Sequence, residues 1–165
     1  MSQRLQIFSC GGTIDKVYFD DLSEFHVGAP QVVPLLEEAK YDVPYDFTPI
    51  LSKDSLELTD EDRQLIRDQV AASSATKIVI THGTDTMVET GQALLGIEDK
   101  TIVLTGSLQP ARFKSTDAAF NIGCAVTAVQ LLSPGVYIGI NGRTFSAANC
   151  RKNREAQRFE TLDGS

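Results

Sequence analysis

The chain has 165 residues, a length that suits a single domain with one hydrophobic core of ordinary size. Its hydrophobic fraction of 42% and charged fraction of 22% are typical of a soluble globular protein, so we expect neither a disordered nor a membrane-bound chain. No apolar run approaches the roughly 20 residues that cross a bilayer. The formal net charge of −7 argues against a nucleic-acid partner, because a phosphate backbone is bound chiefly through Lys and Arg.

The three cysteines, Cys10, Cys124 and Cys150, are scattered widely and odd in number. This pattern favours reduced thiols in a cytoplasmic protein over a disulfide framework or a zinc site. The first residues lead directly into a predicted strand, so we expect no signal peptide. Cys10 adjoins a candidate site, but a free cysteine is more often a small core residue, and we interpret it as a buried bystander.

The first predicted strand, residues 5–9, runs directly into Gly11-Gly12-Thr13. Residues 14–28 are polar and aromatic, with Asp20-Asp21 as turn formers, and we expect them to form a hairpin or flexible loop. Residues 31–40 carry apolar side chains at helical spacing, which predicts a helix.

A second strand is predicted over residues 46–51 and ends in Ser52-Lys53-Asp54-Ser55. A helix follows over about residues 59–72, with a threonine cap and three acidic residues in its first turn that favour the helix dipole. Residues 77–81 form the third predicted strand, ahead of a helix over about residues 85–95.

The fourth predicted strand, residues 101–105, ends in Gly106-Ser107. A helix is predicted over about residues 116–132, and residues 135–140 form the fifth strand. The remainder, residues 144–165, is polar and basic and has no clear period.

Short, nearly continuous apolar strands thus alternate with helices along most of the chain. This order is typical of an α/β fold with an open, mostly parallel sheet and helices on both faces. There is no internal repeat, low-complexity segment or linker, and we therefore interpret residues 1–165 as a single domain.

In open α/β sheets, ligands bind at the carboxyl ends of the strands, along one edge of the sheet. Hydroxyls, carboxylates and glycines accumulate at these predicted ends, and glycine lets backbone approach a ligand closely. The segments concerned are Gly11-Gly12-Thr13, Asp54-Ser55, Gly83-Thr84-Asp85, Gly106-Ser107 and Asn141-Gly142. Their convergence predicts a site centred on the stretch that follows the third strand.

A threonine hydroxyl is a weak nucleophile unless a neighbouring base takes its proton. Histidine offers little help, because the chain has only His26 and His82 and lacks a G-x-S-x-G nucleophile elbow. We interpret His82 as a structural residue that bonds the backbone of the glycine turn. A lysine desolvated next to a carboxylate is the alternative base, because burial lowers its pKa.

Other ligands are disfavoured by the motifs. Gly11-Gly12 is too short for a dinucleotide fingerprint, and there is no P-loop lysine pattern. The two histidines lack metal-ligand spacing, and Asp20-Asp21 is more often a solvated turn than a metal site.

Two signatures nevertheless resemble those of a known family. Gly11-Gly12-Thr13-Ile14 after a strand, followed by the stretch from Thr81 to Met87, resembles the bacterial L-asparaginase family. The likeness extends through Asp54-Ser55 and Gly106-Ser107 to Arg151-Lys152-Asn153, and so covers essentially the whole chain. The family usually has two domains, and the chain is similar to the N-terminal one alone, as in short, single-domain asparaginases of the Rhodospirillum rubrum type.

The resemblance implies hydrolysis of the side-chain amide of L-asparagine to L-aspartate and ammonia. Thr13 would be the nucleophile that forms an acyl-enzyme, and Tyr18 would polarise or deprotonate it. Thr84, Asp85 and Lys152 would form a second cluster, in which Lys152 tunes the Thr84 hydroxyl that helps to activate water. No metal or organic cofactor is implied.

The resemblance also assigns substrate contacts. Asp85 would hold the α-ammonium group of the substrate and Ser55 its α-carboxylate, while the backbone N–H of Thr84 would face the developing oxyanion. The full set of implied substrate-binding residues is Gly12, Asp54, Ser55, Gly83, Thr84, Asp85 and Ser107.

Two departures from the family pattern bear on activity. Leu56 stands where relatives often have Gln or Ser, and Phe25 stands where full-length relatives have a tyrosine, which makes Tyr18 the better candidate. With the C-terminal domain missing as well, we expect looser substrate recognition and weak glutaminase activity. A homodimer or homotetramer is expected. The alternatives are a broader glutaminase/asparaginase amidase and a non-catalytic amino-acid sensor.

Overall fold

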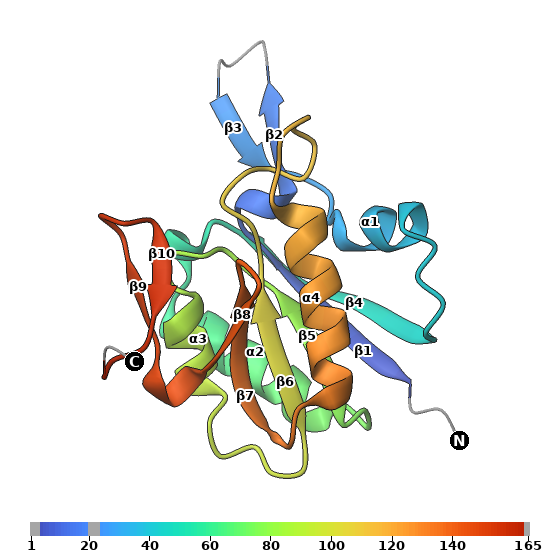
Figure 1. Ribbon diagram of the computed structural model, residues 1–165, viewed down its shortest axis with the longest axis vertical. Helices are drawn as coiled ribbons and strands as arrows, with labels where there is room; N and C mark the ends of the chain where they lie inside the picture. The colour runs from blue at the N-terminus through green and yellow to red at the C-terminus, as the bar shows by residue number, and fades with distance from the viewer. Residues whose placement is uncertain (1–3, 20–23, 164–165) are drawn as a thin grey trace.

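The computed structural model describes residues 4–19 and 24–163, and a six-stranded sheet forms its centre (Figure 1). The strands in chain order are β1 (Leu5–Gly11), β4 (Tyr45–Lys53), β5 (Lys77–Thr81), β6 (Thr101–Thr105), β7 (Gly135–Ile140) and β8 (Arg143–Ser146). They lie in the order β4-β1-β5-β6-β7-β8, and every neighbouring pair is parallel except the antiparallel β7–β8 pair. The prediction of an open, mostly parallel sheet is confirmed.

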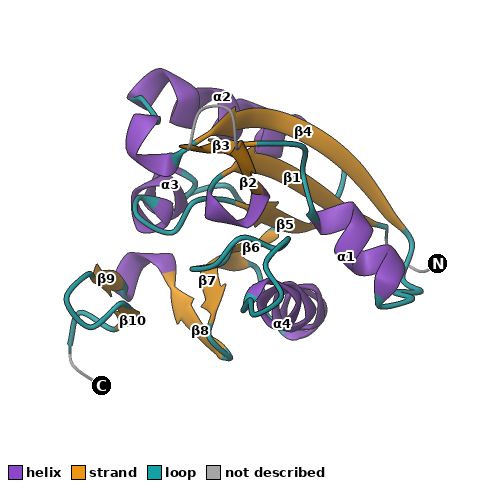
Figure 2. Ribbon diagram, turned by 90° about the horizontal axis from the view of Figure 1, so that it is seen from above, coloured by secondary structure: helices purple, strands orange, loops and turns teal. Residues whose placement is uncertain are grey.

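Two helices cover each face of this sheet, as Figure 2 shows from above. The helices are α1 (Val32–Glu38), α2 (Asp60–Ala72), α3 (Met87–Ala93) and α4 (Ala118–Leu131). Helices α2 and α3 pack on one face, and α1 and α4 pack on the other. Within the described part of the chain, no helix is both long enough and apolar enough to cross a membrane.

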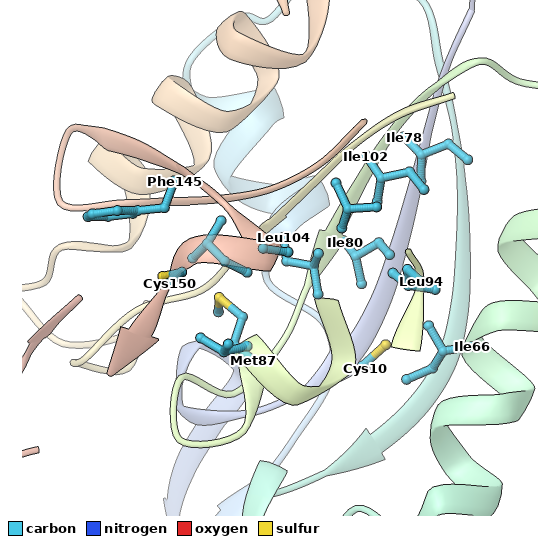
Figure 3. Close-up of a cluster of buried hydrophobic side chains, with 14 of the residues drawn as sticks. Cys10, Ile66, Ile78, Ile80, Met87, Leu94, Ile102, Leu104, Phe145 and Cys150 are labelled. Atoms are coloured by element: carbon cyan, nitrogen blue, oxygen red, sulfur yellow. The ribbon is translucent and has the colours of Figure 1, made fainter. Parts of the chain in front are cut away.

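The core explains why the strands are apolar throughout. In β5, Ile78 and Ile80 belong to the cluster under α2 and α3, whereas Val79 belongs to the cluster under α1 and α4. Side chains alternate between the two faces of a strand, so a central strand that is covered on both sides, such as β5 or β6, buries nearly every position. Figure 3 shows the first cluster, in which Cys10 and Cys150 pack as apolar groups. The interpretation of Cys10 as a buried residue is confirmed.

The boundaries of two helices depend on their first residues. Helix α2 begins as predicted, because the hydroxyl of Thr59 accepts the N–H of Asp62 and the Asp62 carboxylate accepts the N–H of Thr59. The next helix, predicted over about residues 85–95, is α3, which begins two residues later at Met87 and ends at Ala93. Thr86 stays outside the helix, where its hydroxyl donates to the Ser55 carbonyl at 2.7 Å and holds the turn.

A two-stranded hairpin follows β1 and lies outside the main sheet (Figure 1). Its strands are β2 (Lys16–Phe19) and β3 (Glu24–Val27), which pair in antiparallel register. The hairpin predicted over residues 14–28 is confirmed, while its predicted Asp20-Asp21 turn lies outside the described residues.

The region after β7 contains structure that the sequence pattern did not indicate. Beyond β8, the short strands β9 (Arg151–Asn153) and β10 (Arg158–Glu160) form a second hairpin. Each has three residues, which is too short to give a recognisable period. The hairpin is fixed by Phe159, whose buried ring joins the first core cluster.

Candidate active site

The ends of three strands approach one another so closely that only glycine fits between them. Gly12, which follows β1, has a φ of 92°, and a Cβ there would lie 2.4 Å from the backbone of Gly83. A Cβ on Gly83 would in turn lie 2.6 Å from the Ser55 side chain, which follows β4. This packing brings the segment that carries Thr13 beside the segment that carries Thr84.

The second signature forms a closed cluster with a lysine from the far end of the chain. The Nζ atom of Lys152 donates to Thr84 Oγ1 at 2.8 Å and to Asp85 Oδ1 at 2.7 Å. The lysine side chain is only 11% exposed. Its position follows from the β9–β10 register, which pairs Lys152 with the buried Phe159.

A pocket of about 320 Å³ lies at this edge of the sheet. Four of the five predicted catalytic residues line it, namely Thr13, Thr84, Asp85 and Lys152. A threonine hydroxyl thus shares one cavity with a hydroxyl, a carboxylate and an ammonium group, all from separate segments. Such a set can support nucleophilic attack and stabilise the charges that develop during it.

Tyr18 is not brought to this pocket. It lies on β2, where its ring centroid is 5.2 Å from that of Phe25 on the opposite strand, and the side chain is 47% exposed. Figure 1 shows the β2–β3 hairpin extending from one end of the molecule, away from β9 and β10. Tyr18 is therefore not among the residues that line the pocket with Thr13.

The remaining predicted substrate-binding residues lie around the pocket and do not line it. The Ser55 hydroxyl is buried and accepts the N–H of Thr86 at 3.3 Å. Asp54 pairs with Lys16 at 2.7 Å and accepts the N–H of Leu56. Although burial opposes ionisation of Asp54, these partners hold its pKa below the usual range.

Ser107, also predicted to bind substrate, is fully buried and donates its hydroxyl to the Gln109 carbonyl. Four other residues line the pocket that the motifs did not single out: Leu108, Gln109, Arg154 and Gln157. A weak signal exists for two of them. Gln109 lies two residues beyond Ser107, and Arg154 lies two residues beyond Lys152.

Comparisons with known proteins agree with this arrangement. Residues 4–164 match the family model described as Asparaginase, N-terminal. The chain belongs to the asparaginase family. It is 29% identical over 163 residues to an L-asparaginase of Bacillus licheniformis, covering 92% of this chain and 50% of that one. It is 38% identical over 92 residues to a glutaminase-asparaginase of Acinetobacter glutaminasificans, covering 53% of this chain and 28% of the relative.

The fold gives the same result. L-asparaginase I from Vibrio cholerae superimposes with a TM-score of 0.82 at 26% identity, covering 98% of this chain and 52% of that one. The asparaginase-family chain therefore spans about half the length, or less, of these relatives. Its six-stranded sheet and early hairpin match the N-terminal asparaginase domain.

His82 has the structural role expected of it in this asparaginase-family domain. It is fully buried, with Nδ1 2.7 Å from the Gly83 carbonyl and Nε2 2.8 Å from the Thr90 hydroxyl. Burial lowers its pKa to about 4, so the ring is neutral near pH 7. With both nitrogens engaged, it holds the turn before Thr84 and is not available as a base.

A second hollow, of about 370 Å³, lies on the other side of Asp85 and Lys152. Its potential nucleophile is Cys150, but burial raises the pKa of that thiol to about 11. The thiol is therefore protonated at neutral pH and unreactive. Among the described residues, no group of three or more His, Cys, Asp or Glu side chains is placed to hold a metal ion.

Asp15 is a buried carboxyl group that the motifs did not reveal. It is 1% exposed; Oδ1 accepts the N–H of Gln31 at 2.9 Å, and Oδ2 has no hydrogen-bond partner. Its backbone carbonyl accepts the N–H of Gly28 at 2.7 Å, across the base of the β2–β3 hairpin. Burial raises its pKa to about 7, although the Gln31 N–H and the charge of Arg112 oppose the rise.

Proposed function

We propose that this chain hydrolyses the side-chain amide of L-asparagine to L-aspartate and ammonia. The observation that carries the proposal is the pocket shared by Thr13 and the Lys152–Thr84–Asp85 cluster. Membership of the asparaginase family supports it. The proposal concerns the chain as given, which spans half of the Bacillus licheniformis relative.

The first step forms an ester between enzyme and substrate. Thr13 Oγ1 attacks the amide carbon, the C–N bond breaks, and the nitrogen leaves as ammonia with the hydroxyl proton of Thr13. We assign the transfer of that proton to Tyr18 after hairpin closure. The backbone N–H of Thr84 stabilises the oxyanion, and one such donor typically contributes about 2.7–4 kcal/mol.

The second step returns the free enzyme. Water attacks the ester carbon, the bond to Thr13 Oγ1 breaks, one proton of the water passes to that oxygen to restore the hydroxyl, and aspartate leaves. Because Lys152 donates to Thr84 Oγ1, the hydroxyl proton of Thr84 points elsewhere and is available to orient substrate or water. Lys152 engages Oδ1 of Asp85, so we assign the substrate ammonium group to Oδ2.

Ammonia release from L-asparagine tests the assignment. Thr13→Ala and Thr84→Val should each lower kcat/KM by roughly three orders of magnitude or more, because each removes a reacting hydroxyl. Thr144→Ala, at an exposed threonine on β8, is the matched control and should leave turnover unchanged. Wild-type rates in both pocket variants would overturn the proposal.

A broader amidase is the second candidate, favoured by the likeness to the Acinetobacter glutaminasificans glutaminase-asparaginase. Comparing kcat/KM for asparagine and glutamine separates the two, and equal values would favour the broader activity. A non-catalytic sensor would bind aspartate in calorimetry and release no ammonia from any amide.

We further propose that residues 1–165 act as one catalytic domain of the short Rhodospirillum rubrum type, in the cytoplasm, as a homodimer or homotetramer. Cys10, Cys124 and Cys150 are free thiols in the described part of the chain, which is consistent with a reducing compartment. Light scattering coupled to size-exclusion chromatography tests the assembly. A monomer at all concentrations would contradict it.

A further inference from the structure

A free amino-acid amide such as asparagine carries an α-ammonium group and an α-carboxylate into the pocket. The carboxylate needs a partner there. The α-ammonium group has Asp85, which lines the cavity. The α-carboxylate needs a cation or several N–H donors, because an unpaired charge is costly to desolvate. This question rests on the proposed function.

Ser55, the residue that the family resemblance assigns to the carboxylate, has poor access to the cavity. It is 2% exposed and lies beneath Gly83. Its hydroxyl already accepts the N–H of Thr86. In this structure Ser55 is therefore buried and is not among the residues that line the cavity.

Two cations line the pocket, Lys152 and Arg154. Lys152 is engaged by Asp85 and Thr84 at 2.7 and 2.8 Å. Arg154 lies two residues further along, and its Nη2 atom donates to the backbone carbonyl of Asp85 at a long 3.4 Å. Its guanidinium group therefore stands at the cavity wall beside the residues that would hold the rest of the substrate.

The other arginines of the β9–β10 hairpin show that this position is unusual. Arg151 and Arg158 both pair with Glu160, at 2.6 and 3.6 Å. Within residues 4–19 and 24–163, Arg154 has no carboxylate partner in an ion pair. The one arginine of this hairpin that faces the pocket is thus the one whose planar donor fork is available for a carboxylate.

We propose that Arg154 binds the α-carboxylate of the substrate and so determines specificity for free amino-acid amides. The guanidinium group forms a charge-assisted pair with the carboxylate while Asp85 holds the ammonium group on the same side of the cavity. Arg154 does not touch the scissile amide, so it acts on substrate binding and not on the chemical step.

Steady-state ammonia release from L-asparagine tests this role. Arg154→Ala should raise KM roughly tenfold or more while kcat stays within about twofold, because a hydrogen bond to a charged group is removed from binding alone. Arg154→Lys should recover part of the loss, since it keeps the charge but not the planar fork. Arg151→Ala, which removes a guanidinium group already paired with Glu160, is the matched control and should leave KM unchanged.

Two inhibitors that each lack one substrate charge identify the contact. Succinamic acid keeps the carboxylate and 3-aminopropanamide keeps the ammonium group. Arg154→Ala should weaken inhibition by succinamic acid and leave inhibition by 3-aminopropanamide unchanged. A KM within twofold of wild type in Arg154→Ala would overturn the inference, as would equal weakening of both inhibitors, or a KM increase confined to Ser55→Ala. Absence of ammonia release from any amide by the wild-type chain would instead refute the proposed function itself.

Discussion

The Lys152–Thr84–Asp85 cluster and the β2–β3 hairpin are built in opposite ways. The cluster lies where several strand ends meet, and its lysine is fixed by short bonds and by a buried phenylalanine in the opposite strand. The hairpin is a two-stranded ribbon with exposed aromatic rings, outside the main sheet. Isolated hairpins are marginally stable in water. The Lys152–Thr84–Asp85 cluster is therefore assembled before substrate binds, whereas the hairpin that carries Tyr18 is not.

The two regions meet at the residues around the nucleophile. Thr13 begins a short turn directly after the close-packed Gly12, and Asp15 ends that turn at the base of the hairpin. Thr13, the proposed nucleophile, thus lies beside the close-packed glycines, whereas its proposed activator, Tyr18, belongs to the hairpin. We infer that the cluster determines the rate of the chemistry more strongly than the hairpin does.

The largest effect is expected from breaking the cluster. Lys152→Met removes the donor to Thr84 and the partner of Asp85 while keeping a long apolar stem. We expect kcat/KM for asparagine to fall by about three orders of magnitude, as for the loss of a group that assists proton transfer. Ammonia release measures the rate, and circular dichroism checks folding. Lys152→Arg should retain more activity, and a loss of less than tenfold in Lys152→Met would contradict a preassembled cluster.

A second effect concerns stability at the junction of the two regions. The pKa of Asp15 is raised to about 7, so the folded state holds its proton more tightly than the unfolded state does. Its stabilising contribution is therefore complete below the unfolded pKa of about 3.9 and is lost as pH rises through 7. From pH 5 to pH 8, the free energy of unfolding should fall by about 2–3 kcal/mol more in wild type than in Asp15→Asn.

Urea denaturation of both chains at the two pH values measures this difference. Other titrating groups, such as His82, with its pKa lowered to about 4, are common to both chains and cancel in the comparison. Parallel pH dependence in the two chains would show that Asp15 does not titrate in this range.

The smallest effect is expected from the hairpin. Tyr18→Phe removes the hydroxyl to which we assign transfer of the Thr13 proton. Because this side chain does not line the pocket, we expect kcat to fall roughly a hundredfold, the lower end of what a proton-transfer group contributes. The paired variant Tyr18→Phe/Phe25→Tyr moves the hydroxyl to the opposite strand and tests which position is used. If Tyr18→Phe lost as much activity as Lys152→Met, the comparison between the two regions would be wrong.

Much of the fold could be predicted because buried apolar residues recur in the sequence at the spacing of strands and helices. The run of apolar residues in β5 reflects two covered faces, and Thr59 reflects the unpaired N–H groups at the start of α2. Strands β9 and β10 show no such spacing, because each has only three residues and a period cannot be recognised over so short a segment. The likeness to the asparaginase family singled out Lys152 as a site residue but predicted neither strand.

Some residues of the candidate site could be predicted from the sequence and others could not. Thr13, Thr84 and Asp85 meet in one pocket because parallel strands deliver their carboxyl ends to one edge, and the antiparallel β9–β10 hairpin brings Lys152 to the same pocket. Whether a residue at that edge faces the cavity or lies under its floor depends on side-chain packing, which spacing does not encode. Ser55 and Ser107 lie under the floor, and Arg154 faces the cavity. Asp15 gave no signal, because an aspartate after a glycine turn is normally solvated.

The contact between Gly12 and Gly83 has a consequence for how this pocket can change during evolution or engineering. The segments that carry Thr13 and Thr84 contact each other through the main chain of Gly12 and Gly83. Replacing side chains on the pocket floor therefore cannot widen the space between these segments by one methylene group. Under the proposed function, acceptance of the longer glutamine therefore depends on the rim residues Leu108, Gln109, Arg154 and Gln157. Libraries restricted to those rim positions should yield altered specificity at a far higher frequency than libraries aimed at the glycines.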